Sequence, residues 1–300
     1  MLLIQNGILD TMTEDGTFRG DLLIEDGRIS QVAARIDGDT LPPHTRMNAQ
    51  GLRICPGLID AHLHLTEDDD GRCGTDALCE DALAAGVTTQ GIWTEDGCII
   101  RHGRDAAAPQ GGMRILHPDG MTEDELRQPM QHAVQQGERI ACEVHDEKQL
   151  RRLLRLREET GAALVLAHLT GCESMLEDVV ASGSEVILSA CAMRGGRNSY
   201  AMAKQLCAAG VTVALSSDHP TTRLHHLPLC AGLCLRSGMP RQDVMRAITL
   251  NAARLLRVDD VCGSIRAGKR ADLAIFDGDP LLLATSLVSV VSGGHILRKS

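Results

Sequence analysis

Short apolar runs alternate with amphipathic segments between residues 54 and 258, and this alternation constrains the fold more than any other feature. The runs at 139–144, 163–167, 185–189 and 211–216 are rich in Val, Leu, Ile and Ala, as in strands buried on both faces of a parallel sheet. Because successive parallel strands need crossover helices, the alternation predicts an α/β fold. Its many repeats favour a (β/α)8 barrel of the TIM type.

Both ends of the chain have a different pattern. In residues 1–53 short strands are separated by turns, and Asp26-Gly27 between two apolar stretches is typical of a β-hairpin. Residues 259–300 return to short strands with glycine turns. We therefore expect the two ends to pair into a small β-sandwich domain beside a barrel formed by residues 54–258.

The barrel is expected to be trimmed. Residues 94–110 are interpreted as a loop, so the third and fourth barrel strands are hard to place. A helix is predicted over residues 122–136, where Thr122 and Glu125 form a capping box, although Pro129 should kink or break it.

Polar side chains follow four of the apolar runs at the points where the predicted strands end. In a parallel barrel the carboxyl ends of the strands meet at one mouth, where active sites lie. Side chains two apart on a strand face the same way, so both members of such a pair point inward. Buried histidine or aspartate without partners is costly, and a shared divalent cation would satisfy them all. The residues are His62 and His64, Glu143 and His145, His168, and Asp218.

The plainer alternative is that these are ordinary polar residues near strand ends. A His-x-His pair is common by chance, so His62 and His64 would carry little weight in isolation. Four independent strand ends with the same chemistry favour a metal site over that alternative.

Several motifs resemble a known family. The string PGLIDAHLH at 56–64 resembles the signature of the amidohydrolase superfamily, and GVTT at 86–89 resembles its second barrel strand. The segments AITLNAA at 247–253 and GSIRAGKRADLA at 263–274 are similar to its usual closing segment. Within the superfamily the chain resembles the imidazolonepropionase-related enzymes, which implies a metal-dependent hydrolase.

The resemblance implies roles for the residues at the strand ends. His62 and His64 would bind the more buried metal ion, and Asp218 would complete its ligands. His145 and His168 would bind a second ion, or one of them would help to hold substrate in a single-metal enzyme. Asp218 would also take a proton from the attacking water and pass it to the leaving group. The expected cofactor is one or two divalent ions, with zinc the first choice.

The ligand that bridges two metals in many members of the superfamily has no clear counterpart here. That position is usually a lysine or a glutamate on the fourth barrel strand, and the strand at 113–116 is followed by Asp119 but by no lysine. Lys148 and Lys204 lie on predicted helices. The bridge is therefore expected to be Glu143 or Asp119, or to be absent.

Three further residues are candidates for binding substrate. His219 follows Asp218 directly, so it either lines the site or belongs to an ordinary loop. Arg194 and Arg197 flank two glycines after the run at 185–189, and a basic loop at the mouth of a barrel can bind a substrate carboxylate.

These features predict a hydrolase that cleaves a carbon–nitrogen bond other than a peptide bond, in a cyclic or linear amide or an amidine. The alternatives are a single-metal deaminase of a small heterocycle and a non-catalytic binding subunit with the same fold. We expect a small-molecule substrate and a homo-oligomer.

Composition argues against other classes of partner. A net charge of −10 and only four aromatic residues disfavour nucleic-acid binding. No apolar run approaches the roughly 20 residues that span a membrane. An odd number of cysteines, 11, without a CxxC pair or a signal peptide favours a cytoplasmic protein.

Overall fold

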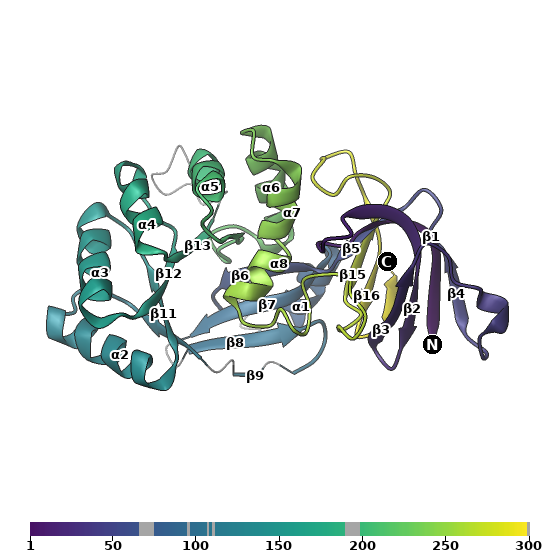
Figure 1. Cartoon of the computed structure of the whole chain (residues 1–300), viewed down its shortest axis with the longest axis horizontal. Coiled ribbons are helices and arrows are strands. Elements are labelled where there is room, and N and C mark those ends of the chain that lie inside the picture. The colour runs from purple at the N-terminus through teal and green to yellow at the C-terminus, as the bar shows by residue number, and fades with distance from the viewer. Residues whose placement is uncertain (66–74, 95–96, 107, 110–111, 190–198, 299–300) are drawn as a thin grey trace.

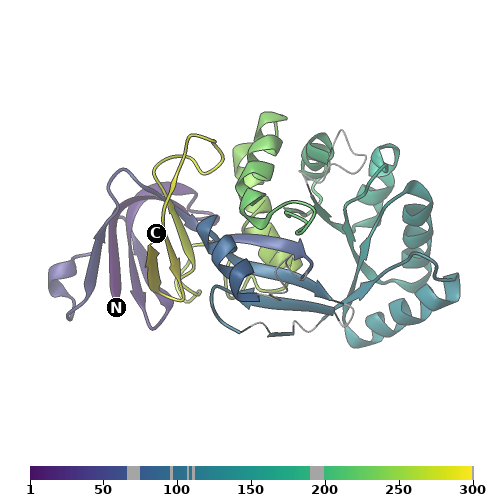
Figure 2. The ribbon, with the colours of Figure 1, turned by 180° about the vertical axis from the view of Figure 1, so that it is seen from behind.

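The structure is a computed structural model that describes residues 1–65, 75–94, 97–106, 108–109, 112–189 and 199–298. It has an α/β part and a β-rich part, and both chain ends lie in the β-rich part (Figures 1 and 2). The predicted pairing of the two ends is therefore present.

The β-rich part is one hydrogen-bonded sheet in the order β17-β16-β15-β5-β1-β2-β3, with β4 paired to β1. β5 joins the two ends of the chain, because it pairs in parallel with β1 and antiparallel with β15. A sandwich was expected, whereas hydrogen bonds connect all eight strands into a single sheet. Its strands are β1 (Leu2–Asp10), β2 (Thr17–Glu25), β3 (Arg28–Ala33), β4 (Thr45–Asn48), β5 (Arg53–Pro56), β15 (Leu273–Phe276), β16 (Leu287–Ser292) and β17 (His295–Arg298).

The α/β part contains a parallel five-stranded sheet in sequence order from β10 to β14, and a four-stranded sheet from β6 to β9. Helices α2 to α6 follow one another along one side of the strands (Figures 1 and 2). The strands are β6 (Leu58–Leu63), β7 (Val87–Thr94), β8 (Gly97–His102), β9 (Ala108–Pro109), β10 (Met113–Leu116), β11 (Arg139–Glu143), β12 (Ala163–Ala167), β13 (Glu185–Leu188) and β14 (Val213–Leu215). The helices are α1 (Thr75–Ala84), α2 (Glu123–Gln136), α3 (Glu147–Thr160), α4 (Leu176–Ser182), α5 (Ser199–Ala208), α6 (Leu227–Arg236), α7 (Arg241–Ala247) and α8 (Leu250–Leu255), with 3-10 turns η1 (Gly38–Thr40), η2 (Glu173–Met175) and η3 (Leu224–His226).

The strands of the expected barrel are joined by backbone hydrogen bonds only in part, as two separate sheets. The two sheets of the α/β part meet where β14 approaches β6, and there the described pairing is a single bridge between Leu63 and His219. The interpretation of residues 94–110 as a loop was wrong, because β8 turns back on β7 as an antiparallel strand. The tight turn is supported by the Thr94 hydroxyl, which donates to the carbonyl of Gly97. With no crossover helix between β7 and β8, the pair can only be antiparallel.

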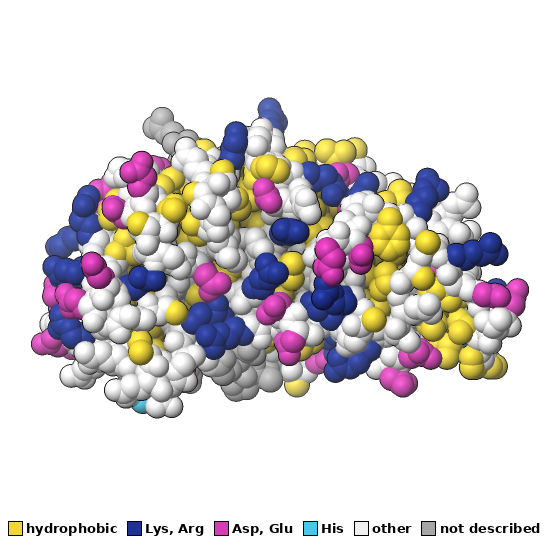
Figure 3. Space-filling view, in the orientation of Figure 1, with side chains coloured by type: hydrophobic (Ala, Val, Ile, Leu, Met, Phe, Trp, Pro, Cys, Tyr) yellow, Lys and Arg dark blue, Asp and Glu magenta, His cyan; other side chains and the backbone are white. Residues whose placement is uncertain are grey.

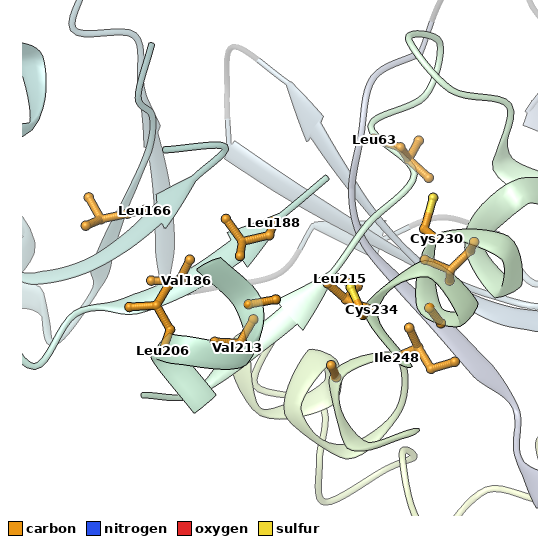
Figure 4. Close-up of a cluster of buried hydrophobic side chains, with 14 of the residues drawn as sticks. Leu63, Leu166, Val186, Leu188, Leu206, Val213, Leu215, Cys230, Cys234 and Ile248 are labelled. Atoms are coloured by element: carbon orange, nitrogen blue, oxygen red, sulfur yellow. The ribbon is translucent and has the colours of Figure 1, made fainter. Parts of the chain in front are cut away.

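Continuous apolar runs are explained by burial of both faces of the parallel strands. Small residues such as Ala141, Ala167 and Ala214 line the inner face, where opposing strands approach. Leu166, Leu188 and Leu215 point outward to the helices, where Leu206 of α5 and Cys230 and Cys234 of α6 pack nearby (Figure 4). Each fully buried leucine of this kind contributes about 2 kcal/mol to folding.

Local signals also decide how α2 begins and continues. Thr122 and Glu125 form the predicted capping box at its N-terminus. Of the kink or break expected at Pro129, the break does not occur, because α2 continues to Gln136 with the proline inside it. The buried side chains of Leu126 and Met130, on either side of the proline, keep the helix packed on the core.

On the face shown in Figure 3, acidic and basic side chains are interspersed and no large patch of one sign is present. In the described part of the chain, every helix is too short or too polar to cross a lipid bilayer.

A buried ion cluster ties the two parts together. Asp10, fully buried at the end of β1, pairs with Arg53 of β5 and with Arg241 at the start of α7, each at 2.8 Å. Arg241 also pairs with Asp279 at 2.5 Å. Burial alone would raise the pKa of Asp10, but hydrogen bonds from Thr17, Arg241 and Arg53 outweigh burial and hold this pKa below its ordinary value.

We predict that Asp10→Asn lowers the free energy of unfolding by about 3 kcal/mol at neutral pH, because two half-buried arginines lose the fully buried carboxylate that they share. The pKa of Asp10 is lower in the folded chain than in the unfolded chain. Its contribution is therefore fully present above the unfolded-state pKa of about 3.9, and it is lost as pH falls through the folded-state value. Urea unfolding of wild type and variant across acidic pH would measure this, and the difference between them should shrink with acidification.

Asp39→Asn is the matched control, because the Asp39–Arg46 pair at 2.8 Å is exposed and belongs to a single domain. Its unfolding midpoint should equal that of wild type. An equally large loss in this control, or a loss in Asp10→Asn that does not depend on pH, would contradict the role of the buried cluster.

Candidate metal centre

Strand β6 and the residue directly after it carry three polar side chains on one face. Asp60, His62 and His64 alternate with apolar residues, so all three point into the α/β part from the same side of the strand. Asp60 and His62 are fully buried, whereas the side chain of His64 is one-third exposed. The three polar side chains therefore lie at different depths: Asp60 and His62 are inside, and His64 is nearest the surface.

The first group of ligand atoms surrounds one oxygen of Glu143. Oε1 of Glu143, at the end of β11, lies 3.2 Å from Nε2 of His62 and 2.9 Å from Nε2 of His64. These two contacts hold the pKa of Glu143 far below its ordinary value, although burial opposes them. The same carboxylate raises the pKa of His64, whose ring also bonds to the backbone of Trp93.

The second group lies on the other side of the His62 ring. Oδ1 of Asp218 is 3.6 Å from Nδ1 of His62 and 3.7 Å from Nε2 of His168. Burial lowers the pKa of His168 to about 3, with a further contribution from His62, so its ring is neutral and offers a lone pair. Burial raises the pKa of Asp218.

The backbone at two of these candidate ligands, His168 and Asp218, has an unusual conformation. His168 and Asp218 have φ angles of 70° and 58°, in the left-handed region that costs a residue other than glycine about 1 kcal/mol. Such strain occurs mostly at functional sites, where surrounding contacts impose it.

These residues fit a divalent cation. Nδ1 of His62 is fully buried and has no hydrogen-bond partner in the described part of the structure. Separations of 3.6 and 3.7 Å exceed a hydrogen bond, but they are close to the about 3.5 Å expected between two ligands of one zinc ion. Imidazole and carboxylate donors suit zinc, manganese or iron. The described residues contain two groups that could hold an ion, His62–His64–Glu143 and His62–His168–Asp218, and His62 belongs to both.

Two predicted ligands lie farther out. His145 lies two residues beyond the end of β11, its side chain is about half exposed, and its Nε2 is 3.5 Å from Oε2 of Glu143. Its ring stacks on that of His168 with centroids 5.7 Å apart. Asp119 is exposed and outside both groups, and its carboxylate accepts a hydrogen bond from Gln149. Of the two candidate bridges, Glu143 is therefore the one at the centre, with one oxygen toward His62 and the other toward His145.

The substrate-binding candidates have different outcomes. His219 is half-buried beside Asp218, and its carbonyl accepts a hydrogen bond from the backbone of His64. Its Nδ1 is buried without a partner among the described atoms, and burial lowers the pKa of its ring. Arg194 and Arg197 lie outside the described residues.

Sequence reasoning missed two contributors. The ring of Trp93 on β7 meets His62 edge to face, with centroids 4.2 Å apart. Asp60 accepts hydrogen bonds from the backbone and hydroxyl of Ser217, while burial raises its pKa to about 7. The alternation of Asp60, His62 and His64 was a usable signal for Asp60, but its partner Ser217, two residues beyond the end of β14, was not visible from spacing.

A model of the amidohydrolase family matches residues 106–298. The chain belongs to this family. The family predicted from the sequence motifs is thereby confirmed, and partial matches to imidazolonepropionases support the predicted relation to those enzymes. Imidazolonepropionase of Bacillus velezensis is 32% identical over 117 residues, a match that spans 37% of this chain and 27% of that protein. The chain thus covers much less than two thirds of the length of such relatives.

Solved structures share the fold over nearly the whole chain. An amidohydrolase from Thermotoga maritima MSB8 has a TM-score of 0.85 at 20% identity, with complete coverage of both chains. A β-aspartyl dipeptidase from Fervidobacterium islandicum AW-1, solved with a β-Asp-Leu dipeptide, has a TM-score of 0.76 at 17% identity and covers 99% of this chain and 96% of its own. These likenesses support the barrel-like fold with an additional domain.

We predict that Glu143→Gln weakens binding of Zn²⁺ by at least about tenfold, because a carboxylate in contact with two candidate ligands is lost. Competition with a chromophoric chelator would measure the affinity. Asp119→Asn is the matched control, since it changes the other candidate bridge and should bind Zn²⁺ as wild type does. The reverse ranking of the two variants would show that Asp119 is the relevant carboxylate.

Proposed function

We propose that this amidohydrolase is a metal-dependent hydrolase that cleaves a carbon–nitrogen bond other than a peptide bond, in a small cyclic or linear amide or an amidine. The observation that carries the proposal is the convergence of His62, His168 and Asp218 around a buried ring nitrogen that has no hydrogen-bond partner among the described residues. Such a group is costly to bury unless a ligand completes it. The family supplies the expectation that this ligand is a divalent cation, with zinc the first choice.

His62, His64, His168, Asp218 and Glu143 would hold one or two ions. When bound, a divalent ion lowers the pKa of water toward neutrality and polarises the substrate carbonyl. Glu143 would supply ligand oxygens to one or two ions, because one of its oxygens faces His62 and His64 and the other faces His145.

Asp218 is suited to move the proton. Its carboxylate lies between the rings of His62 and His168, and burial raises its pKa toward the range in which it can accept and release a proton. It would accept a proton from the attacking water and pass it to the leaving nitrogen. His145 and His219, at the rim, would hold the polar part of the substrate.

The class of bond that the protein cleaves distinguishes this proposal from the alternative functions. Metal-loaded protein would be tested against cyclic amides, N-acyl amino acids, amidines, aminated heterocycles, and α- and β-linked dipeptides. Ring opening or amide cleavage supports the proposal, whereas ammonia release from heterocycles would indicate a deaminase. Cleavage of dipeptides alone would instead place the chain with the dipeptidases that share its fold. Protein that takes up no Zn²⁺, Mn²⁺ or Fe²⁺ would contradict an enzymatic role.

We predict that Asp218→Asn lowers kcat by about a thousandfold or more on any substrate found, because the amide cannot accept the proton. Asp279→Asn, a half-buried carboxylate far from the centre, is the control and should keep wild-type kcat. Circular dichroism and unfolding would show that both variants fold. Comparable turnover in Asp218→Asn and wild type would refute the proton-transfer role.

A further inference from the structure

The carboxylate of Asp60 is buried directly behind the candidate centre. It is fully buried and accepts three hydrogen bonds from Ser217 and one from the backbone of His62. The Ser217 hydroxyl donates to Oδ2 at 2.5 Å, and the Ser217 amide lies 3.2 Å from each carboxylate oxygen. The backbone of His62 donates to Oδ1 at 3.4 Å.

These contacts connect β6 to the residues that follow β14, and the two strands have almost no backbone pairing with each other. Between β6 and β14, the described backbone pairing is the bridge of Leu63 with His219, together with the bond from the amide of His64 to the carbonyl of His219. Neighbouring parallel strands elsewhere in this part are joined along their length, as β11 and β12 are. A side-chain carboxylate therefore connects β6 and β14, whereas backbone hydrogen bonds connect neighbouring parallel strands elsewhere in this part.

The position of the clamp ties it to the ligands. Asp60 is two residues before His62 on β6, and Ser217 is the residue directly before Asp218. The hydroxyl of Ser217 also accepts a hydrogen bond from the amide of His219, so it connects Asp60 to both sides of Asp218. Asp218 has a strained φ of 58°, and flanking contacts of this kind can impose such a conformation.

We infer that Asp60 and Ser217 form a positioning clamp that sets the separation between Asp218 and His62. The inference rests on the proposed function in that it takes these two residues as ligands of one ion. A displacement of about 1 Å in such an arrangement can cost a hundredfold in rate, and loss of an outer hydrogen bond typically costs tenfold to a hundredfold in metal affinity. Neither Asp60 nor Ser217 needs to touch the ion or the substrate.

The test is the affinity of full-length protein for Zn²⁺, measured by chelator competition in wild type, Ser217→Ala and Ser217→Thr. Ser217→Ala should bind Zn²⁺ at least about tenfold more weakly than wild type, because Asp60 loses its shortest hydrogen bond. Ser217→Thr retains a hydroxyl and should recover affinity to within about threefold. With Co²⁺ as the probe, Ser217→Ala should also change the visible absorption bands, which report ligand geometry.

Ser289→Ala is the matched control for loss of a buried serine hydroxyl. Ser289 lies on β16 in the β-rich part, is 5% exposed and donates to the carbonyl of Leu297. It should lower stability as Ser217→Ala does but leave the Zn²⁺ affinity and the Co²⁺ spectrum unchanged.

The outcomes separate the clamp from the proposed function. Wild-type affinity and spectrum in Ser217→Ala would overturn the clamp while leaving the proposed function standing. Equal losses of affinity in Ser217→Ala and Ser289→Ala would also overturn it, since the effect would then follow stability alone. A wild-type protein that binds neither Zn²⁺ nor Co²⁺ would contradict the proposed function, and the clamp with it.

Discussion

The candidate centre depends on how β6 and β14 are held together, and the buried carboxylate of Asp60 is the main link between them. A fully buried carboxylate is costly unless several donors satisfy it, and Ser217 and the backbone of His62 provide them. The same contacts fix the residues that follow: His62 on one strand and Asp218 on the other. β6 and β14 have little backbone pairing, and these contacts hold them together where His62 and Asp218 come close.

The charges of the centre explain why a cation suits it better than hydrogen bonds alone. Glu143 is matched by the rings of His62 and His64, and the low pKa of this carboxylate shows that it stays ionised. Asp218 is matched less fully: the side chain of Thr221 donates a hydrogen bond to its carboxylate, but its Oδ1 is 3.6 Å from His62 and 3.7 Å from the neutral ring of His168. A divalent ion between these three groups would satisfy the carboxylate and both nitrogens at once.

Much of this arrangement follows from local pattern, and the rest depends on contacts between distant segments. Continuous apolar runs predicted β11 to β14 because both faces of each strand are buried, and the polar residues after them met at one mouth as expected. The antiparallel turn of β8 was missed because strand direction depends on pairing across the fold. Glu143 and His145 were expected to face the same way, and Nε2 of His145 lies 3.5 Å from Oε2 of Glu143. Because β11 ends at Glu143, His145 lies beyond the strand, where its side chain is about half exposed. The contact of Asp60 with Ser217 joins residues 157 positions apart, which spacing cannot reveal.

The β-rich part matters to the centre because its strand β5 leads directly along the chain into β6. β5 belongs to that sheet and ends at Pro56, and only Gly57 separates it from β6. The amide of Gly57 donates to the carbonyl of Asp272 at 2.8 Å, so the junction is pinned to the C-terminal segment. A β-carbon on Gly57 would lie 2.0 Å from the Thr88 hydroxyl, which leaves no room for a larger residue. Strand β6, which carries His62 and leads into His64, is thus anchored at its start by the β-rich part and in its middle by Asp60, and both ends of the chain contribute to its placement.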